Sequence, residues 1–134
     1  MTKAAIRQSL ADCKTIAVVG LSPKPHRDSF RVAKYMQDHG YRIVPINPNA
    51  TEVLGEKAYA SLTEAAQHAR IDMVNCFRNS EDIPPIAKEA IAIGAKSLWL
   101  QIGVVNDDAA KQATDAGLVV VQNLCLMVEH RQLG

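Results

Sequence analysis

The sequence predicts a single doubly wound α/β domain, in which helices cover both faces of a five-stranded parallel sheet. Short apolar runs of strand length recur at intervals of roughly 25 residues, and segments with helical spacing lie between them. The first run, Ile16 to Val19, is apolar throughout, as expected for a strand that is covered on both faces. A chain of 134 residues can bury one core. This alternation favours parallel strands joined by right-handed crossovers.

We expect the strand order 3-2-1-4-5, with strands counted along the chain. This order places the switch point of the sheet between the first and fourth strands, and ligands bind there beyond the carboxyl ends of the strands. The loop at Gly20 should therefore lie beside residues 101–104.

The predicted strands span residues 15–19, 41–47, 71–77, 97–102 and 118–122. Pro45 lies near the end of the second strand, which indicates a lost ladder bond or a sheet edge at that point. Residues 50–60 have no strand or helix pattern, and we expect an irregular connection there.

The predicted helices span residues 2–11, 28–39, 61–69, 81–93, 106–116 and 125–131. Thr2 is the expected cap of the first helix, which should pack on the domain as part of residues 1–13. Ser61 and Glu64 fit a capping box, and Asn106 is the expected cap of the fifth helix.

Composition and charge predict a cytoplasmic protein that binds neither nucleic acid nor membrane. Hydrophobic residues make up 48% of the chain, and a net charge of +1 gives no basic surface for general nucleic-acid binding. No apolar run approaches the roughly 20 residues of a membrane helix, and the N-terminus lacks the apolar core of a signal peptide. The three cysteines form no CxxC pair, so we expect neither a disulfide framework nor a metal site.

The loop between the first strand and its helix is the main candidate for a binding site. Backbone amides and the positive end of the helix dipole meet at such a junction and bind phosphates. The loop is an incomplete dinucleotide fingerprint, because Ser22 stands where the second glycine would be and no third glycine follows. It carries Lys24 and Arg27 instead.

These cations indicate a ligand with more phosphate than NAD. The second strand ends in Asn47, whereas an acidic residue there would bind the ribose hydroxyl of NAD. Lys24, Arg27 and Arg78 follow the carboxyl ends of strands, and Arg42 starts a strand at the far end. NADP and coenzyme A both combine a diphosphate with an additional ribose phosphate. The alternative is that these cations are solvated loop residues, but the loop position of Lys24 and Arg27 favours function.

Motifs along nearly the whole chain from Thr15 resemble one family. They are Gly20-Leu21-Ser22, Pro25, Arg27, Ser29, Val32-Ala33, Gly40-Tyr41, Pro45, Asn47-Pro48, Asp72, Val74, Phe77-Arg78, Pro84, Ile86, Gly94-Ala95-Lys96, Trp99-Leu100-Gln101, Gly103-Val104 and Ala116 to Val120. Their order and spacing resemble the single-domain coenzyme A-binding proteins, which are similar to the CoA-binding domain of the succinyl-CoA synthetase α-subunit. The resemblance implies a Rossmann-like domain that binds CoA, with no established reaction for the stand-alone form.

The resemblance also implies where parts of CoA bind. It places Gly20, Ser22 and Arg27 at the phosphates, Asn47 and Pro48 by the adenosine, Phe77 and Arg78 at the rim of the third strand, and Gln101 and Gly103 beside the pantetheine. Lys24 joins the phosphate group on its charge and loop position. A core aromatic is an equally good interpretation of Phe77, and Trp99 is expected mainly to pack in the core.

The chain departs from the family at residues 123–125, where Asn123-Leu124-Cys125 replaces a common Asp-Arg-Cys run. The loss of two charges argues against a polar role at this edge of the pocket. Cys125 suggests thiol exchange, because CoA itself carries a thiol, but a buried and inert cysteine at a helix start is the more frequent case.

We predict a non-catalytic module that binds or senses CoA or an acyl-CoA. The phosphorylated histidine of succinyl-CoA synthetase belongs to a second domain, and His26, His39, His68 and His130 show no catalytic spacing here. A reaction and an unidentified protein partner are left open. One alternative is the nucleotide domain of an NADP-dependent oxidoreductase, and another is a protein-interaction subunit with a vestigial pocket.

Overall fold

The computed structural model describes residues 3–133, so the predicted cap at Thr2 lies outside the described residues. Its centre is a parallel five-stranded sheet in the order β2-β1-β5-β6-β7. The strands are β2 (Arg42–Ile46), β1 (Thr15–Val19), β5 (Met73–Cys76), β6 (Ser97–Leu100) and β7 (Val119–Val121). The predicted fold class, a doubly wound Rossmann-like α/β domain, is confirmed.

The predicted strand order is wrong. Counted along the predicted strands, the observed order is 2-1-3-4-5, in which β1 pairs with β5 from Ile16↔Met73 to Val19↔Cys76. All four residues of β5 are buried, which suits an interior strand, whereas β2 begins with exposed Arg42 and lies at the edge. The switch point therefore lies between β1 and β5, and not between the first and fourth predicted strands.

Pro45 lies in β2, which is an edge strand of the sheet, as the sequence indicated. The backbone N and C=O of Pro45 point away from β1. Its carbonyl accepts a hydrogen bond from Tyr59 N at 3.0 Å, and the nitrogen of the same residue points the same way. The missing N–H therefore removes no bond to β1. The connection predicted to be irregular contains a small hairpin, β3 (Glu52–Val53) and β4 (Glu56–Lys57), so that prediction is corrected.

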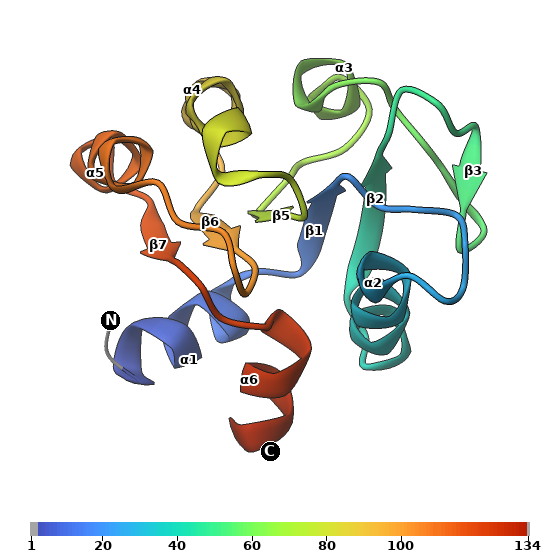
Figure 1. The fold of residues 1–134 in the computed structure, drawn as a ribbon, viewed down its shortest axis with the longest axis horizontal. Coiled ribbons are helices and arrows are strands. Elements are labelled where there is room, and N and C mark those ends of the chain that lie inside the picture. Colours follow the sequence, from blue (N-terminus) through green and yellow to red (C-terminus); the bar gives the residue numbers. More distant parts are fainter. Residues whose placement is uncertain (1–2, 134) are drawn as a thin grey trace.

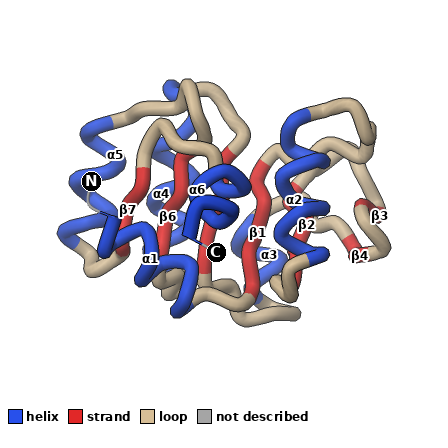
Figure 2. The backbone as a smooth tube through the Cα atoms, turned by 90° about the horizontal axis from the view of Figure 1, so that it is seen from below, coloured by secondary structure: helices blue, strands red, loops and turns tan. Residues whose placement is uncertain are grey.

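The helices form two layers, one on each face of the sheet (Figures 1 and 2). One layer consists of α3 (Leu62–Ala66), α4 (Ile83–Ala92) and α5 (Asp107–Asp115). The other consists of α1 (Lys3–Asp12), α2 (Asp28–Asp38) and α6 (Leu126–Leu133). Each layer packs on its own cluster of buried residues, and Trp99, fully buried, belongs to the cluster under α1, α2 and α6.

The predicted caps of two helices are confirmed. The Ser61 side chain accepts a bond from Glu64 N at 3.1 Å, and Asn106 accepts from Ala109 N at 3.0 Å. Among the described residues, no helix is long and apolar enough to cross a membrane.

Candidate functional site

Gly20 directly follows β1 at the switch point, and its position leaves no room for a side chain. Its φ of +86° lies in the left-handed region, and an added Cβ would be 2.9 Å from Phe77 O and 3.2 Å from Arg78 Cδ. Its N–H donates to Ile46 O at 2.9 Å. The backbone of β1 is thus held directly between the ends of β2 and β5, where only glycine fits.

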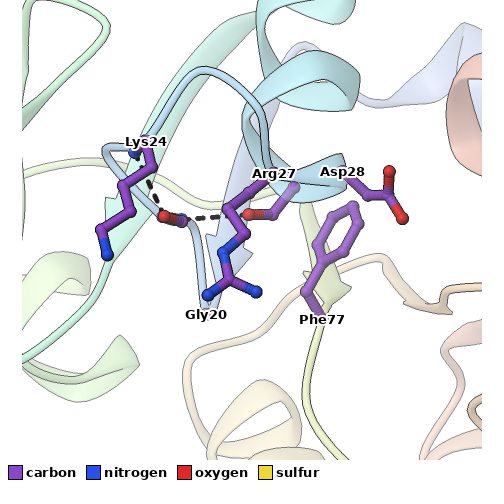
Figure 3. A pocket seen from close by; sticks show the side chains of 7 residues that line it. Gly20, Lys24, Arg27, Asp28 and Phe77 are labelled. Carbon is purple, nitrogen blue, oxygen red and sulfur yellow. Dashed lines mark hydrogen bonds between the residues drawn. The ribbon is translucent and has the colours of Figure 1, made fainter.

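Hydrogen bonds fold the loop after Gly20 onto the start of α2. Ser22 N donates to Ser29 Oγ at 3.0 Å, and Lys24 N donates to Ser22 Oγ at 3.1 Å. Because the Ser22 hydroxyl accepts from Lys24 N and donates to none of the described residues, its own proton is available to a ligand. Figure 3 shows both hydrogen bonds beside Gly20.

Asn47 supports this loop from the neighbouring strand. Its Nδ2 donates to Leu21 O at 2.9 Å, and its Oδ1 accepts from Asn49 N at 2.8 Å. The side chain therefore ties the loop to the end of β2 and closes the turn that follows it. It does not line the clefts described below.

The first cleft, of about 410 Å³, opens over the loop and the start of α2. It is lined by Gly20, Ser22, Lys24, Arg27, Asp28, Ser29 and Phe77. Arg27 is the N-cap residue of α2, in an extended conformation, and its own side chain makes no capping hydrogen bond to the described residues. The first amides of α2 and the positive end of its dipole are therefore open toward an anion.

The charge in the first cleft is positive. The side chains of Lys24 and Arg27 are exposed and have no hydrogen-bond or ion-pair partner within residues 3–133. Asp28 forms a salt bridge with Arg31 one turn along α2. In Figure 3, Lys24 and Arg27 extend on the same side of the cleft, whereas Asp28 points away beyond the Phe77 ring.

A second cleft, of about 250 Å³, lies between α2 and α6 over the ends of β5 and β6. It is lined by Asp28, Arg31, Val32, Phe77, Gln101, Ile102, Cys125 and Met127. Asp28 and Phe77 line both clefts, so the second cleft continues from the first around the Phe77 ring. Most of its further lining is apolar, which suits a less polar part of a ligand.

Gln101 holds the floor of the second cleft and the start of α6. It is 4% exposed, and its Oε1 accepts from Leu126 N at 2.9 Å and from Asn75 Nδ2 at 3.2 Å. These donors fix the orientation of the amide. In the described part of the chain its Nε2 has no acceptor, and since Gln101 lines the cleft, this donor is left for the cleft.

A third cleft, of about 160 Å³, lies on the other face of the sheet and contains Pro48 and Arg78. Ser61 and Glu89 also line it. The stem of Arg78 lies against Gly20, and its guanidinium is 3.5 Å from Asp82. Arg78 therefore stands on the opposite side of Gly20 from the first cleft.

The structure brings most of the predicted site residues to these clefts. The first cleft contains Gly20, Ser22, Lys24, Arg27 and Phe77, the second contains Phe77 and Gln101, and the third contains Pro48 and Arg78. Asn47 and Gly103 line none of the three. Gly103 is exposed, and its N–H donates to Asn123 Oδ1 at 2.7 Å.

The expectation that the Gly20 loop lies beside residues 101–104 is corrected. Phe77 and Arg78 contact Gly20, and Gln101 lies beyond Phe77 because β5 separates β1 from β6. The sequence reasoning missed Arg31, Val32, Ile102 and Met127 as lining residues. No local motif marks them, since four separate elements supply the second cleft.

Cys125 also differs from its expected state. Burial raises the pKa of the Cys13 and Cys76 thiols to about 12, so these two are the buried and inert cysteines. Cys125 is half-buried and lines the second cleft. Among residues 3–133, no group of three His, Cys, Asp or Glu side chains could hold a metal ion.

Two of the histidines pack α6 on α2. The Tyr35 hydroxyl and His130 Nδ1 are 3.0 Å apart, and the Tyr35 ring stacks on His39 at a centroid distance of 4.0 Å. Tyr41 meets the His130 ring edge-on at 5.7 Å. Burial, and then the nearby His39, lowers the pKa of His130. This cluster fixes α6, which forms one wall of the second cleft.

Comparisons with known proteins find relatives over most of the chain. A family model described as a CoA binding domain matches residues 14–131. The uncharacterized protein YneT of Bacillus subtilis is 45% identical over 129 residues, which are 96% of this chain and 94% of that protein. The ADP-forming acetate–CoA ligase II of Archaeoglobus fulgidus is 24% identical over 102 residues, which are 75% of this chain and 15% of the ligase.

Solved structures share the fold over all or most of the chain. A hypothetical protein from Pyrococcus horikoshii OT3 superposes with a TM-score of 0.93 at 41% identity, over 100% of this chain and 94% of that chain. A Thermus thermophilus protein gives a TM-score of 0.92 at 34% identity, over 100% of both chains. The acetyl-coenzyme A synthetase 1 of Ca. Korarchaeum cryptofilum, at 21% identity and a TM-score of 0.73, shares the fold over 84% of this chain and 26% of its own.

Proposed function

Because the chain belongs to the CoA binding domain family, we propose that its three clefts bind coenzyme A or an acyl-CoA without catalysing a reaction. The observation that carries this proposal is the pair of cations, Lys24 and Arg27, which have no partner among residues 3–133 and lie over the start of α2. They stand where a diphosphate would meet helix amides and the Ser22 hydroxyl.

The pantetheine would run from the first cleft around Phe77 into the second. Its chain combines methylene groups with amides, and the second cleft combines apolar walls with the free donor of Gln101. A thiol or acyl group would then end near α6. This route agrees with the family expectation for Gln101 but leaves Gly103 outside the path.

The adenosine would lie on the side of β2 and the third cleft. Pro48 offers an apolar surface there, and Arg78 adds a cation beside Gly20. Asn47 would act indirectly, by holding the phosphate loop through Leu21 O.

The non-catalytic part of the proposal rests on what the clefts contain. Within the described chain, no histidine lines any of the three, and Asp28 is paired with Arg31. Among the described residues that line the three clefts, including Ser61 and Glu89, no serine or cysteine side chain is hydrogen-bonded to a carboxylate or a histidine, which supports a non-catalytic role. The module would bind the cofactor in the cytoplasm and sense it or present it to a protein partner.

Calorimetric titration with CoA, dephospho-CoA, NAD and NADP tests this function. We expect CoA to bind best, dephospho-CoA to bind more weakly, and Arg27→Ala to weaken CoA binding by about tenfold, the usual cost of a lost charge-assisted hydrogen bond. Arg42→Ala is the matched control, because Arg42 is an exposed arginine at the opposite end of the sheet. It should leave CoA affinity within about twofold.

Two outcomes would reject the proposal. Equal or tighter binding of NADP would favour the nucleotide domain of an oxidoreductase. No heat with any nucleotide would favour a protein-interaction subunit with a vestigial pocket.

A further inference from the structure

Cys125 is placed at the far end of the proposed CoA path. It precedes α6, is half-buried, forms no disulfide and lines the second cleft with Gln101 and Met127. The other two cysteines, Cys13 and Cys76, are buried in the two core clusters. Of the three thiols, Cys125 is therefore the one that a molecule in a cleft can contact.

Hydrogen bonds hold the backbone on both sides of Cys125. Leu124 O accepts from Trp99 Nε1 at 2.8 Å, and Leu126 N donates to Gln101 Oε1 at 2.9 Å. The carbonyl of Cys125 accepts from Glu129 N at 3.0 Å in the first turn of α6. The side chain thus projects into the cleft from a fixed segment and not from a free terminus.

Gln101 points independently to a ligand at this end of the path. It is 4% exposed, yet within residues 3–133 its Nε2 has no acceptor and is left for the same cleft. Because Nε2 is not among the buried polar atoms left without a partner, it is accessible from the cleft, where a bound group can accept from it in place of water. An amide carbonyl of pantetheine, close to the thiol of CoA, is such a group.

We propose that Cys125 undergoes thiol–disulfide exchange with the disulfide form of CoA and retains one CoA as a mixed disulfide. This proposal rests on the proposed function, because the same clefts must first bind the nucleotide part. The ligand class is a disulfide of CoA, and the bond it forms joins Cys125 Sγ to the CoA sulfur.

The exchange requires no separate oxidant. The Cys125 thiol loses its proton and its sulfur attacks one sulfur of the CoA disulfide. The Cys125–CoA bond forms as the CoA–CoA bond breaks, and the second CoA leaves as a thiolate that takes up the proton. One disulfide is consumed and one is made. Excess free thiol reverses the reaction.

Intact-mass spectrometry under non-reducing conditions tests this proposal, with CoA disulfide and glutathione disulfide as the probes. We expect one CoA added per chain, located at Cys125 by peptide mapping, released by dithiothreitol and lost in Cys125→Ser. Binding at the clefts raises the local concentration of the attacked sulfur, so CoA disulfide should react at least roughly tenfold faster than glutathione disulfide. Arg27→Ala should slow only the reaction with CoA disulfide.

The outcomes separate this proposal from the function it rests on. Equal rates with both disulfides, an adduct on Cys13 or Cys76, or no adduct beside normal calorimetric binding of reduced CoA would overturn the exchange and leave CoA binding intact. Absence of both CoA binding and adduct would overturn both proposals. Thermal melting of Cys125→Ser checks that this variant is folded.

Discussion

The first and second clefts contact each other at Phe77 and differ in how they are built. All the lining of the first cleft except Phe77 comes from residues 20–29, a single loop and the start of one helix. The second takes its lining from α2, from the ends of β5 and β6, and from the start of α6. The lining of the first is therefore nearly contiguous in sequence, whereas the lining of the second comes from segments that only the assembled sheet brings together.

This difference decides how each cleft should respond to substitution. Binding of inorganic pyrophosphate would measure the affinity of the first cleft alone, because pyrophosphate has no pantetheine to occupy the second cleft. CoA would report both. Changes at the shared junction should reduce binding of both ligands, whereas changes at α6 should reduce binding of CoA only.

Gly20→Ala should have the largest effect. An alanine at φ +86° is strained, and its Cβ would be 2.9 Å from the Phe77 carbonyl, so we expect the free energy of unfolding to fall by about 3 kcal/mol. Binding of both pyrophosphate and CoA should be lost, because the loop cannot stay in place. Urea denaturation and calorimetry provide the measurements.

Gly94→Ala is the matched control for this substitution. Gly94 also has positive φ, at +76°, but an added Cβ would have no neighbour within 4 Å. A cost of about 1 kcal/mol with unchanged ligand binding is expected from the backbone conformation alone. If Gly20→Ala cost no more than Gly94→Ala, the close approach to Phe77 would not matter.

Gln101→Leu should have the next largest effect, and it should separate the clefts. Leucine leaves Leu126 N without its acceptor at the start of α6, which should lower the free energy of unfolding by about 2 kcal/mol. CoA binding should weaken more than pyrophosphate binding. Gln112→Leu, on the exposed surface of α5, is the control and should change stability by less than about 0.5 kcal/mol. An equal loss for both ligands would contradict two separately built clefts.

The smallest effect should come from acidification, through His130. Its folded pKa lies below the ordinary value of 6.5, mainly because of burial and then because of His39. The folded protein therefore binds this proton less readily than the unfolded chain, and stability present above pH 6.5 is lost as the pH falls toward the lowered pKa.

Thermal unfolding between about pH 7.5 and about pH 5.5 would measure this loss. His130→Gln keeps an oxygen that can accept from Tyr35 and removes the titrating group, so its melting temperature should fall less steeply with acid. The same slope for both proteins would show that His130 does not contribute.

The first cleft could be predicted from the sequence because its determinants are contiguous. Gly20, Ser22, Lys24 and Arg27 lie within one loop, and the physics of helix starts assigns them to an anion without knowledge of the fold. The choice of CoA over NADP came from the family resemblance, since both ligands carry the same types of phosphate.

The second cleft could not be predicted because it depends on strand order. The apolar runs identified all five strands of the parallel sheet. However, the spacing of apolar residues and the length of each run do not say which strands are neighbours. The predicted order places the strand of residues 71–77 at the edge of the sheet. In that order, Phe77 would not lie between Gly20 and Gln101. Pro45 indicated the correct strand order. Proline has no N–H to donate to a neighbouring strand, so it is typical of an edge strand, and β2 is an edge strand.

The indole of Trp99 makes the end of the CoA path visible to spectroscopy. It is the single tryptophan of the chain, it is fully buried, and its N–H is bonded to Leu124, the residue before Cys125. Tryptophan emission from the folded protein thus comes from Trp99 alone. The indole N–H of Trp99 donates to Leu124 O, which belongs to the segment that carries the Cys125 thiol. A shift of that segment would change the colour and intensity of the fluorescence without any added label.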